Sequence, residues 1–244
     1  MNTQRNLEGL TALVTGATSG IGQAAAQALA GHGAEVLVHG RDVARGGVVV
    51  DAITADGGKA RFAGADLSDP AQLDELAEQA GPVDILVNNA GLAWFGPTSD
   101  LAVTTFDQLV TANVRAPYFL VAALAPKMAA RGSGSIINVG SMAGHIGMPG
   151  GAAYGATKGA LVAMTRSWAA EFSSAGVRVN VVAAGPVYTP IQSVQQAEAV
   201  GATTIMGRVA QPDEMANVIV FLASPDASYI TGAVIAADGG RTAI

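Results

Sequence analysis

Short apolar segments rich in β-branched residues alternate along this chain with longer segments of helical periodicity. The predicted strands are Thr11–Thr15, Glu35–His39, Ala60–Ala65, Val83–Val87, Ser135–Val139, Val177–Val182 and Ala233–Ala236. The predicted helices are Ile21–Gly31, Ala44–Ala55, Ala71–Gln79, Phe106–Ala130, Ala153–Phe172 and Asp213–Leu222. Such alternation is typical of βαβ units, which build a parallel sheet covered by helices on both faces. We therefore expect an α/β fold, a single doubly wound domain over residues 1–244 with a seven-stranded parallel sheet.

The composition narrows the partners and location of such a domain. Half of the 244 residues are hydrophobic and 13% are charged, so the chain can bury a sizeable core. Its net charge of −6 disfavours nucleic acid and anionic membranes as partners. It has no cysteine, which is compatible with the cytoplasmic location that we expect, and we expect no metal site. The most apolar long stretch, Ala116 to Ala130, is broken by Pro117, Pro126 and Lys127, so we do not expect a membrane span.

A glycine-rich turn follows the first predicted strand. Residues 15–22 read Thr-Gly-Ala-Thr-Ser-Gly-Ile-Gly and lead into an alanine-rich helix. Glycine permits a tight turn and close approach of the backbone to a ligand, and a helix N-terminus offers unpaired N–H groups to a phosphate. Packing alone can also explain such a turn, whose spacing is GxxxGxG rather than GxGxxG. We expect a dinucleotide here, contacted by Gly16, Thr18, Ser19, Gly20, Ile21 and Gly22.

The end of the second predicted strand bears on which dinucleotide binds. An acidic residue is expected there for a free ribose 2′-hydroxyl, whereas this chain has Gly40 followed by Arg41. Arginine can pair with a 2′-phosphate through two N–H groups, and glycine leaves room for it. We therefore expect NADP(H) in preference to NAD(H), which stays open. The alternative is that Arg41 is a solvated residue that opens the next helix, and Arg45 either assists it or faces water.

Tyr154 and Lys158 stand four residues apart on a predicted helix, hence on one face of it. A phenol has a pKa of about 10, and a nearby ammonium charge lowers that value, which makes the tyrosine a usable acid or base. Ser141, thirteen residues upstream of Tyr154, can hold a carbonyl oxygen. Without further context an ordinary amphipathic helix accounts for the pair equally well.

The context is that several motifs coincide in order and spacing. They are the glycine turn, Asp66-Leu67, Asn88-Asn89-Ala90-Gly91, Asn113, Ser141, Tyr154 and Lys158. On these motifs the chain resembles the short-chain dehydrogenase/reductase family over nearly its whole length. The resemblance implies a Rossmann-type fold and hydride transfer between NADP(H) and a small ketone or secondary alcohol, that is, a carbonyl reductase. It also implies a homo-oligomer, either a tetramer or a dimer.

The resemblance implies roles for single residues. Ser141 and Tyr154 would hold the carbonyl oxygen, with Tyr154 as the proton donor, while Asn113 would bind a water that links Lys158 to solvent. The implied catalytic set is Asn113, Ser141, Tyr154 and Lys158. Cofactor contacts besides the glycine turn would come from Arg41, Asp66, Leu67, Asn89, Ala90, Gly91, Tyr154, Lys158, Val187 and Thr189, and Thr15 would line the turn. Taken singly, each residue has another explanation: Asn113 as an interior asparagine at a helix kink, Asp66 as a turn cap and Ser141 as a turn residue.

The substrate pocket is predicted only in outline. Candidate residues are Ser141, Ala143, His145, Trp94, Tyr154 and Tyr188, together with Phe95 and Met148. Trp94 and Phe95 either form an apolar wall or pack under a neighbouring loop. His145 is read as a surface histidine more readily than as a substrate contact. Residues 191–206 are predicted to form a substrate lid, with an ordinary surface connection as the alternative.

Two other functions remain open. Many relatives reduce 3-oxoacyl groups on an acidic carrier protein. The negative net charge of this chain disfavours such a carrier, and residues 173–176 lack the arginine that those relatives often have there. A catalytically idle NADP-binding sensor of the same fold is the second alternative. One departure from the family follows the sixth predicted strand, where the family usually has Pro-Gly and this chain has Ala184-Gly185-Pro186. Because proline would have fixed a backbone angle, we expect a looser turn before Val187 and Thr189. We expect subunit contacts from Leu161, Met164 and Trp168 and from the C-terminal residues 239–244.

Overall fold

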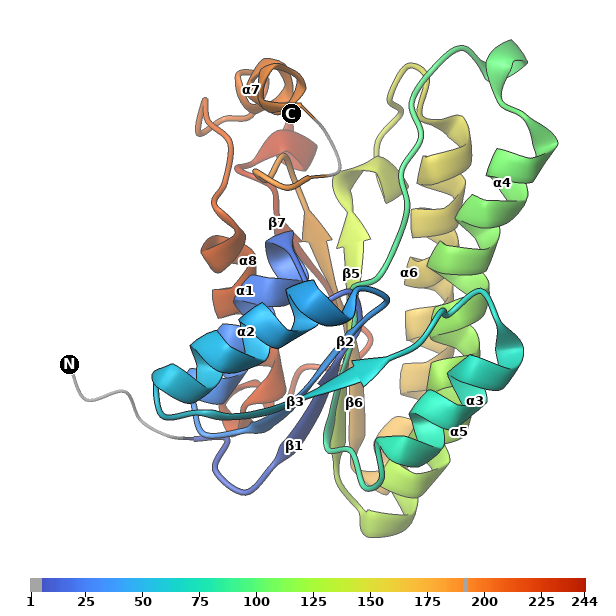
Figure 1. Ribbon diagram of the computed structural model, residues 1–244. Helices are drawn as coiled ribbons and strands as arrows, with labels where there is room; N and C mark the ends of the chain where they lie inside the picture. Colours follow the sequence, from blue (N-terminus) through green and yellow to red (C-terminus); the bar gives the residue numbers. More distant parts are fainter. Residues whose placement is uncertain (1–5, 191–192) are drawn as a thin grey trace.

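Seven parallel strands form one sheet in a computed structural model that describes residues 6–190 and 193–244 (Figure 1). The strands are β1 (Thr11–Val14), β2 (Glu35–Gly40), β3 (Lys59–Gly64), β4 (Ile85–Asn88), β5 (Gly134–Ser141), β6 (Val177–Ala184) and β7 (Val234–Ala237). Their order in the sheet is β3-β2-β1-β4-β5-β6-β7. All seven predicted strands are confirmed to within two residues at each end.

The sheet order reverses between β1 and β4, and this switch point places the site. From β1 the chain winds outward to β3, then returns to β4 on the other side of β1. The residues after β1 and after β4 therefore lie next to each other at the carboxyl edge of the sheet. In doubly wound sheets this crevice is where ligands bind.

Helices cover both faces of the sheet (Figure 1). One face carries α1 (Gly20–Gly31), α2 (Val43–Ala55) and α8 (Pro212–Ala223). The other face carries α3 (Pro70–Gln79), α4 (Val103–Val110), α5 (Ala116–Arg131) and α6 (Ala152–Phe172). The short helix α7 (Val194–Gly201) lies beyond the carboxyl edge, at the top of Figure 1.

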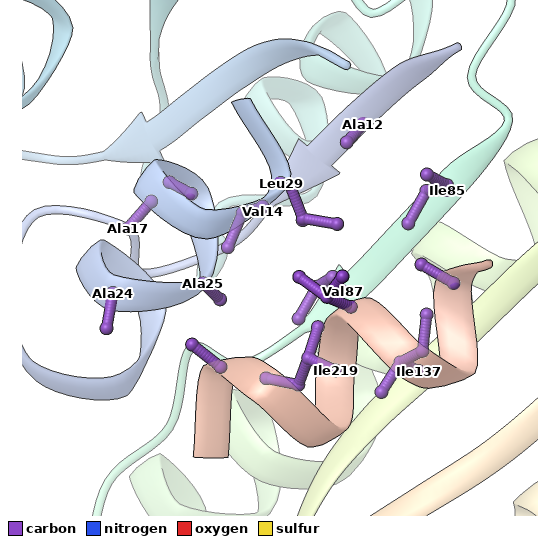
Figure 2. Packing of buried hydrophobic residues seen from close by; sticks show 14 of the residues in the cluster. Ala12, Val14, Ala17, Ala24, Ala25, Leu29, Ile85, Val87, Ile137 and Ile219 are labelled. Atoms are coloured by element: carbon purple, nitrogen blue, oxygen red, sulfur yellow. The ribbon is translucent and has the colours of Figure 1, made fainter. Parts of the chain in front are cut away.

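Alternate side chains of each strand feed two separate cores. In β1, Ala12 and Val14 pack toward α1 and α8, whereas Leu13 packs toward the opposite helices. Figure 2 shows the first core, where Leu29 of α1 and Ile219 of α8 meet β-strand side chains. Burial of one such aliphatic side chain contributes about 1.5–3 kcal/mol. The two cores fix the helix positions from which the functional side chains project.

The predicted helix Phe106–Ala130 is interrupted in the structure. Between α4 and α5 the residues Thr111–Arg115 form one turn of π-helix, which widens the helix by one residue. Pro117 has no N–H to donate to the carbonyl of Asn113 four residues earlier, which favours a wider turn at this point. The wider turn buries the side chain of Asn113, which is 1% exposed.

The combined segment Val103–Arg131 is long and apolar enough to cross a membrane by composition alone, with a mean hydropathy of 1.3. In the structure it packs against the sheet through the buried side chains of Leu120, Leu124 and Met128. These contacts are those of a core helix in an α/β domain.

Two expectations about the surface need correction. Leu161 and Trp168 of α6 are buried in this chain's own core, so the predicted subunit contact from these two residues is wrong, whereas the contact from the partly buried Met164 stays a prediction. The predicted lid, read as loop, contains the helix α7, which begins with a capping box between Ser193 and Gln196. Ile191 and Gln192 of that predicted lid lie outside the described residues.

Candidate active site

The predicted catalytic residues meet at the carboxyl edge of β4 and β5. Ser141 is the last residue of β5, and Tyr154 and Lys158 lie one turn apart on α6, which packs on β5. Asn113 reaches the same place from the π-turn. The ends of one strand and two helical segments thus bring residues 113, 141, 154 and 158 together.

Ser141 and Tyr154 are joined side chain to side chain. Burial raises the pKa of Tyr154, and a hydrogen bond with the Ser141 side chain opposes that rise. The backbone N–H of Ala143 donates to Ser141 Oγ at 3.2 Å and so fixes the hydroxyl. The expectation that an ammonium group lowers the pKa of Tyr154 is therefore wrong for the protein alone, because desolvation dominates.

Lys158 is buried beside that phenol. Its Nζ lies 5.8 Å from the centre of the Tyr154 ring and donates a hydrogen bond to the Val139 carbonyl at 2.9 Å. Burial lowers the pKa of Lys158 to about 8. This amine can therefore exchange a proton near neutral pH, which suits it to support proton transfer at Tyr154.

Asn113 holds the site together through its side chain. Its Oδ1 accepts from the Leu92 N–H at 2.8 Å, and its Nδ2 donates to the Leu92 carbonyl at 2.8 Å and to Thr157 Oγ1 at 3.0 Å. Thr157 in turn donates to the Tyr154 carbonyl at 2.7 Å. Sequence analysis missed Thr157, since its partner is recognisable only once the π-turn is known. The water relay through Asn113 stays a prediction.

The glycine turn is tied to the strand beside it. Thr15 Oγ1 accepts from the N–H groups of Asn89 and Ala90 at 3.0 Å, and Asn89 Nδ2 donates to the carbonyls of Thr15 and Gly16 at 2.9 and 3.1 Å. The side chains of Thr15 and Asn89 are thus used to brace the turn. We infer that these two side chains support a cofactor site by fixing the conformation of the turn.

The turn has the features of a phosphate cradle. Gly16 and Gly20 adopt φ angles of +64° and +54°, a backbone region that favours glycine. A Cβ on Gly22 would stand 2.3 Å from the Gly16 carbonyl oxygen. Ser19 caps α1 without a side-chain hydrogen bond to it, and the first turn of α1 contains no acidic residue. The positive end of the helix dipole is therefore uncompensated and fits an anionic group.

The adenosine end contains one exposed arginine and one paired arginine. Arg45 Nε donates to Asp42 at 2.9 Å, an interaction within the first turn of α2. Arg41 is exposed and interacts electrostatically with Asp66, whose pKa is lowered chiefly by hydrogen bonds from Ser68. Gly40 is required by Thr18, because a Cβ on Gly40 would lie 2.4 Å from the Thr18 methyl group. Glycine at 40 thus has a packing reason besides room for a phosphate.

Leu67 packs against the second core beside Asp66. Gly91 lies close to the side chains of Asn113 and Lys158, since a Cβ there would stand 2.8 Å from Asn113 Oδ1 and 3.6 Å from Lys158 Nζ. The absence of a side chain at Gly91 therefore leaves space in front of Lys158.

Backbone hydrogen bonds hold the segment after β6, and the looser turn expected from the missing proline stays a prediction. Val187 forms a β-bridge with Ala210, in which the Ala210 N–H donates to the Pro186 carbonyl at 2.9 Å and the Tyr188 N–H to the Ala210 carbonyl at 3.1 Å. Thr189 lies against the glycine turn, where a Cβ on Gly20 would stand 3.2 Å from its methyl group. A cavity of about 550 Å³ is lined by Gly20, Gln23, Tyr188, Thr189, Ser193 and Asp213, among others.

Of the predicted substrate contacts, only some gather around Tyr154. The Phe95 ring packs edge-on against the Tyr154 ring, 5.4 Å between centroids, and is 48% exposed. The Trp94 ring instead covers Gly96, and Tyr188 lines the cavity beside α1. Ala143 is buried and His145 is exposed. Among the predicted aromatic pocket residues of the described chain, Phe95 is therefore the one whose ring packs on Tyr154.

Known proteins match the chain over nearly all of its length. The family model described as enoyl-(acyl carrier protein) reductase matches residues 16–242. Gluconate 5-dehydrogenase of Gluconobacter oxydans is 36% identical, over 97% of this chain and 96% of the relative. A solved structure of a short chain dehydrogenase/reductase family protein is 50% identical with a TM-score of 0.91, covering 98% of this chain and 100% of that one. The 3-oxoacyl (acyl-carrier-protein) reductase of Agrobacterium tumefaciens C58, with NADP bound, is 35% identical with a TM-score of 0.92, covering 98% and 96%.

Proposed function

Because this chain belongs to the short-chain dehydrogenase/reductase family and is an oxidoreductase acting on CH–OH groups, we propose that it is an NADP(H)-dependent carbonyl reductase for a small ketone or secondary alcohol. The observation that carries the proposal is the group formed by Ser141, Tyr154 and Lys158. A phenol hydrogen-bonded to a fixed hydroxyl, with a buried amine 5.8 Å from its ring, is suited to give a proton to a carbonyl oxygen.

The residues of the chain manage the proton and the orientation. A bound nicotinamide supplies the hydride in reduction and takes it up in oxidation. Ser141 and Tyr154 hold the carbonyl oxygen, and Tyr154 Oη gives its proton to that oxygen as the carbon–oxygen double bond becomes a single bond. Lys158 stabilises the phenolate that remains, and its pKa of about 8 lets it pass a proton back near neutral pH. Oxidation of an alcohol reverses these proton movements.

NADP(H) is the preferred cofactor in this proposal. The glycine turn and the start of α1 would hold the pyrophosphate, and Val187 and Thr189 would contact the nicotinamide end. Arg41 is exposed at the end of β2, whereas Arg45 is already paired with Asp42. Arg41 is therefore the cation we assign to the 2′-phosphate.

The substrate we propose is small and free rather than bound to a carrier. The half-exposed Phe95 beside Tyr154 offers an apolar wall to a ketone. The 3-oxoacyl reductase reading draws support from the similarity to the Agrobacterium enzyme, but the net charge of −6 opposes long-range attraction of an acidic carrier.

The remaining parts of the proposal concern assembly and access. On α5, Tyr118 and Phe119 are 48% and 51% exposed, and we propose that this face makes the contacts of a homo-oligomer, dimer or tetramer. Residues 191–206, including α7, serve as the substrate lid. The cytoplasm is the proposed location.

An assay of NADPH consumption tests this function. The purified protein is mixed with NADPH and small ketones, a 5-keto sugar acid and a 3-oxoacyl thioester, and the absorbance of the reduced nicotinamide is followed. We expect turnover with a small ketone. Turnover only with the thioester would establish the 3-oxoacyl reading, and NADPH binding without any turnover would establish the sensor.

A further inference from the structure

One buried histidine touches the cofactor turn and has no role so far. His39 stands one residue before the end of β2 and is 3% exposed. The N–H of Gly16 donates to its Nδ1 at 3.3 Å, and its Nε2 lies 3.2 Å from the Ala65 carbonyl oxygen. A neutral imidazole has one donor and one acceptor nitrogen, so these partners fix the proton on Nε2.

The two partners of the ring belong to opposite walls of the adenosine site. Gly16 starts the phosphate turn, and Ala65 directly precedes Asp66. The backbone of the same strand end joins these walls too, since the Ala17 N–H donates to the His39 carbonyl at 2.8 Å and the Ala65 N–H to the Gly40 carbonyl at 3.3 Å. The imidazole therefore bridges the segments that follow β1 and β3, the two neighbours of β2 in the sheet.

The ring is held in its neutral form. Burial lowers the pKa of His39 to about 4. The hydrogen bond to the Ala65 carbonyl opposes this lowering, the charge of Arg41 adds to it and the charge of Asp66 opposes it. Protonation would place a second N–H against the N–H of Gly16. At working pH the acceptor at Nδ1 is thus always available to the turn.

We propose that His39 is a positioning residue that holds the glycine turn in its cofactor-binding conformation through the acceptor at Nδ1. The proposal rests on the nicotinamide dinucleotide site of the proposed function, and it does not depend on the substrate. An apolar residue at 39 would remove the acceptor of the part-buried Gly16 N–H, and the turn would shift to find another.

The test compares three substitutions by direct NADPH binding, measured from nicotinamide fluorescence. In His39→Asn the amide oxygen can stand near the place of Nδ1 and accept from Gly16. In His39→Gln the amide reaches only toward Ala65, and His39→Leu offers neither group. We expect the Kd for NADPH to rise about 10-fold or more in His39→Leu and His39→Gln and to stay within about 3-fold of the original in His39→Asn.

Kinetics and a matched control complete the test. At saturating NADPH we expect kcat of the three variants to stay within about 2-fold of the original. The weaker cofactor binding should therefore appear as a higher KM for NADPH. His32→Leu is the control, because the His32 ring hydrogen-bonds the Ala28 carbonyl in the last turn of α1, at the opposite end of that helix from the glycine turn. An unchanged Kd in His39→Leu would overturn the proposal, and so would tighter binding by His39→Gln than by His39→Asn if His39→Leu does not fold. A protein that binds NADPH but reduces no carbonyl would instead contradict the proposed function and leave the role of His39 standing.

Discussion

Two regions at the carboxyl edge of the sheet are built in different ways. The proposed catalytic wall, made of Asn113, Ser141, Tyr154 and Lys158, is fixed by hydrogen bonds to the backbone of the protein interior, such as Lys158 to Val139 and Asn113 to Leu92. The outer rim, made of Phe95, His145, Tyr188 and α7, is exposed or half-buried. Tyr188 is attached through the bridge at Ala210, and α7 lies beyond the sheet edge (Figure 1).

The difference separates chemistry from selectivity. Proton transfer tolerates little displacement of the reacting groups, so the wall is built from strand ends and a buried helix. Rim residues meet only the variable part of a substrate, and loops can carry them without disturbing the wall. Substitutions in the wall should therefore affect all substrates equally, whereas substitutions in the rim should affect some substrates only.

The largest effect is expected from Tyr154→Phe. The variant keeps the ring that packs on Phe95 but has no proton to give, so kcat/KM should fall about 10³-fold for every substrate that is turned over. NADPH binding and thermal stability should stay close to the original. Steady-state kinetics on two chemically unlike ketones makes the measurement. Retained activity with either ketone would disprove the assignment of the proton donor.

Lys158→Met should reduce kcat/KM on the order of 10²-fold and change the pH dependence of stability. The folded-state pKa of Lys158 is about 8, below its ordinary value of 10.5, so between these values the unfolded chain binds more protons than the folded one. The free energy of unfolding therefore gains on the order of 3 kcal/mol from this group as pH rises through that window.

Urea unfolding at pH 7, 8, 9 and 10 measures this contribution. Methionine cannot titrate, so the stability of Lys158→Met relative to the original should be greatest at pH 7 and should decline toward pH 10. The lost hydrogen bond to Val139 shifts the whole curve without changing its slope. Parallel curves for the two proteins would show that Lys158 is not desolvated in the folded state.

A smaller, cofactor-specific effect is expected from Arg41→Ala. Loss of a charge-assisted pair with the 2′-phosphate should lower kcat/KM for NADPH about 10- to 100-fold and leave that for NADH nearly unchanged. Arg45→Ala is the matched control, because Arg45 is already paired with Asp42. Equal losses in the two variants would mean that the local positive charge as a whole, and not Arg41, selects the phosphate.

The wall was predictable from sequence and the rim was not, for a physical reason. The strands and most helices follow from residue periodicity, and the spacing of Tyr154 and Lys158 follows from one helical turn. The π-turn at Asn113 depends on Pro117 together with burial against α6, and the pKa of Tyr154 depends on desolvation, which no local pattern contains. Which of Trp94 and Phe95 meets Tyr154 depends on how one loop folds back over Gly96.

The smallest effect, and the one that tests the rim, is expected from Phe95→Ala. The Phe95 ring is half-exposed and touches only one edge of the site, so its loss should change kcat/KM about 2- to 10-fold. The change should be a loss for ketones with an apolar substituent and near zero for the smallest ketone, because only the former reach the ring. Phe221→Ala is the control, because Phe221 lies on α8 and is 40% exposed. It should change kcat/KM for neither kind of ketone. A uniform loss across all ketones in Phe95→Ala would place Phe95 in the catalytic wall, as a support for the Tyr154 ring, and would move the boundary between the two regions.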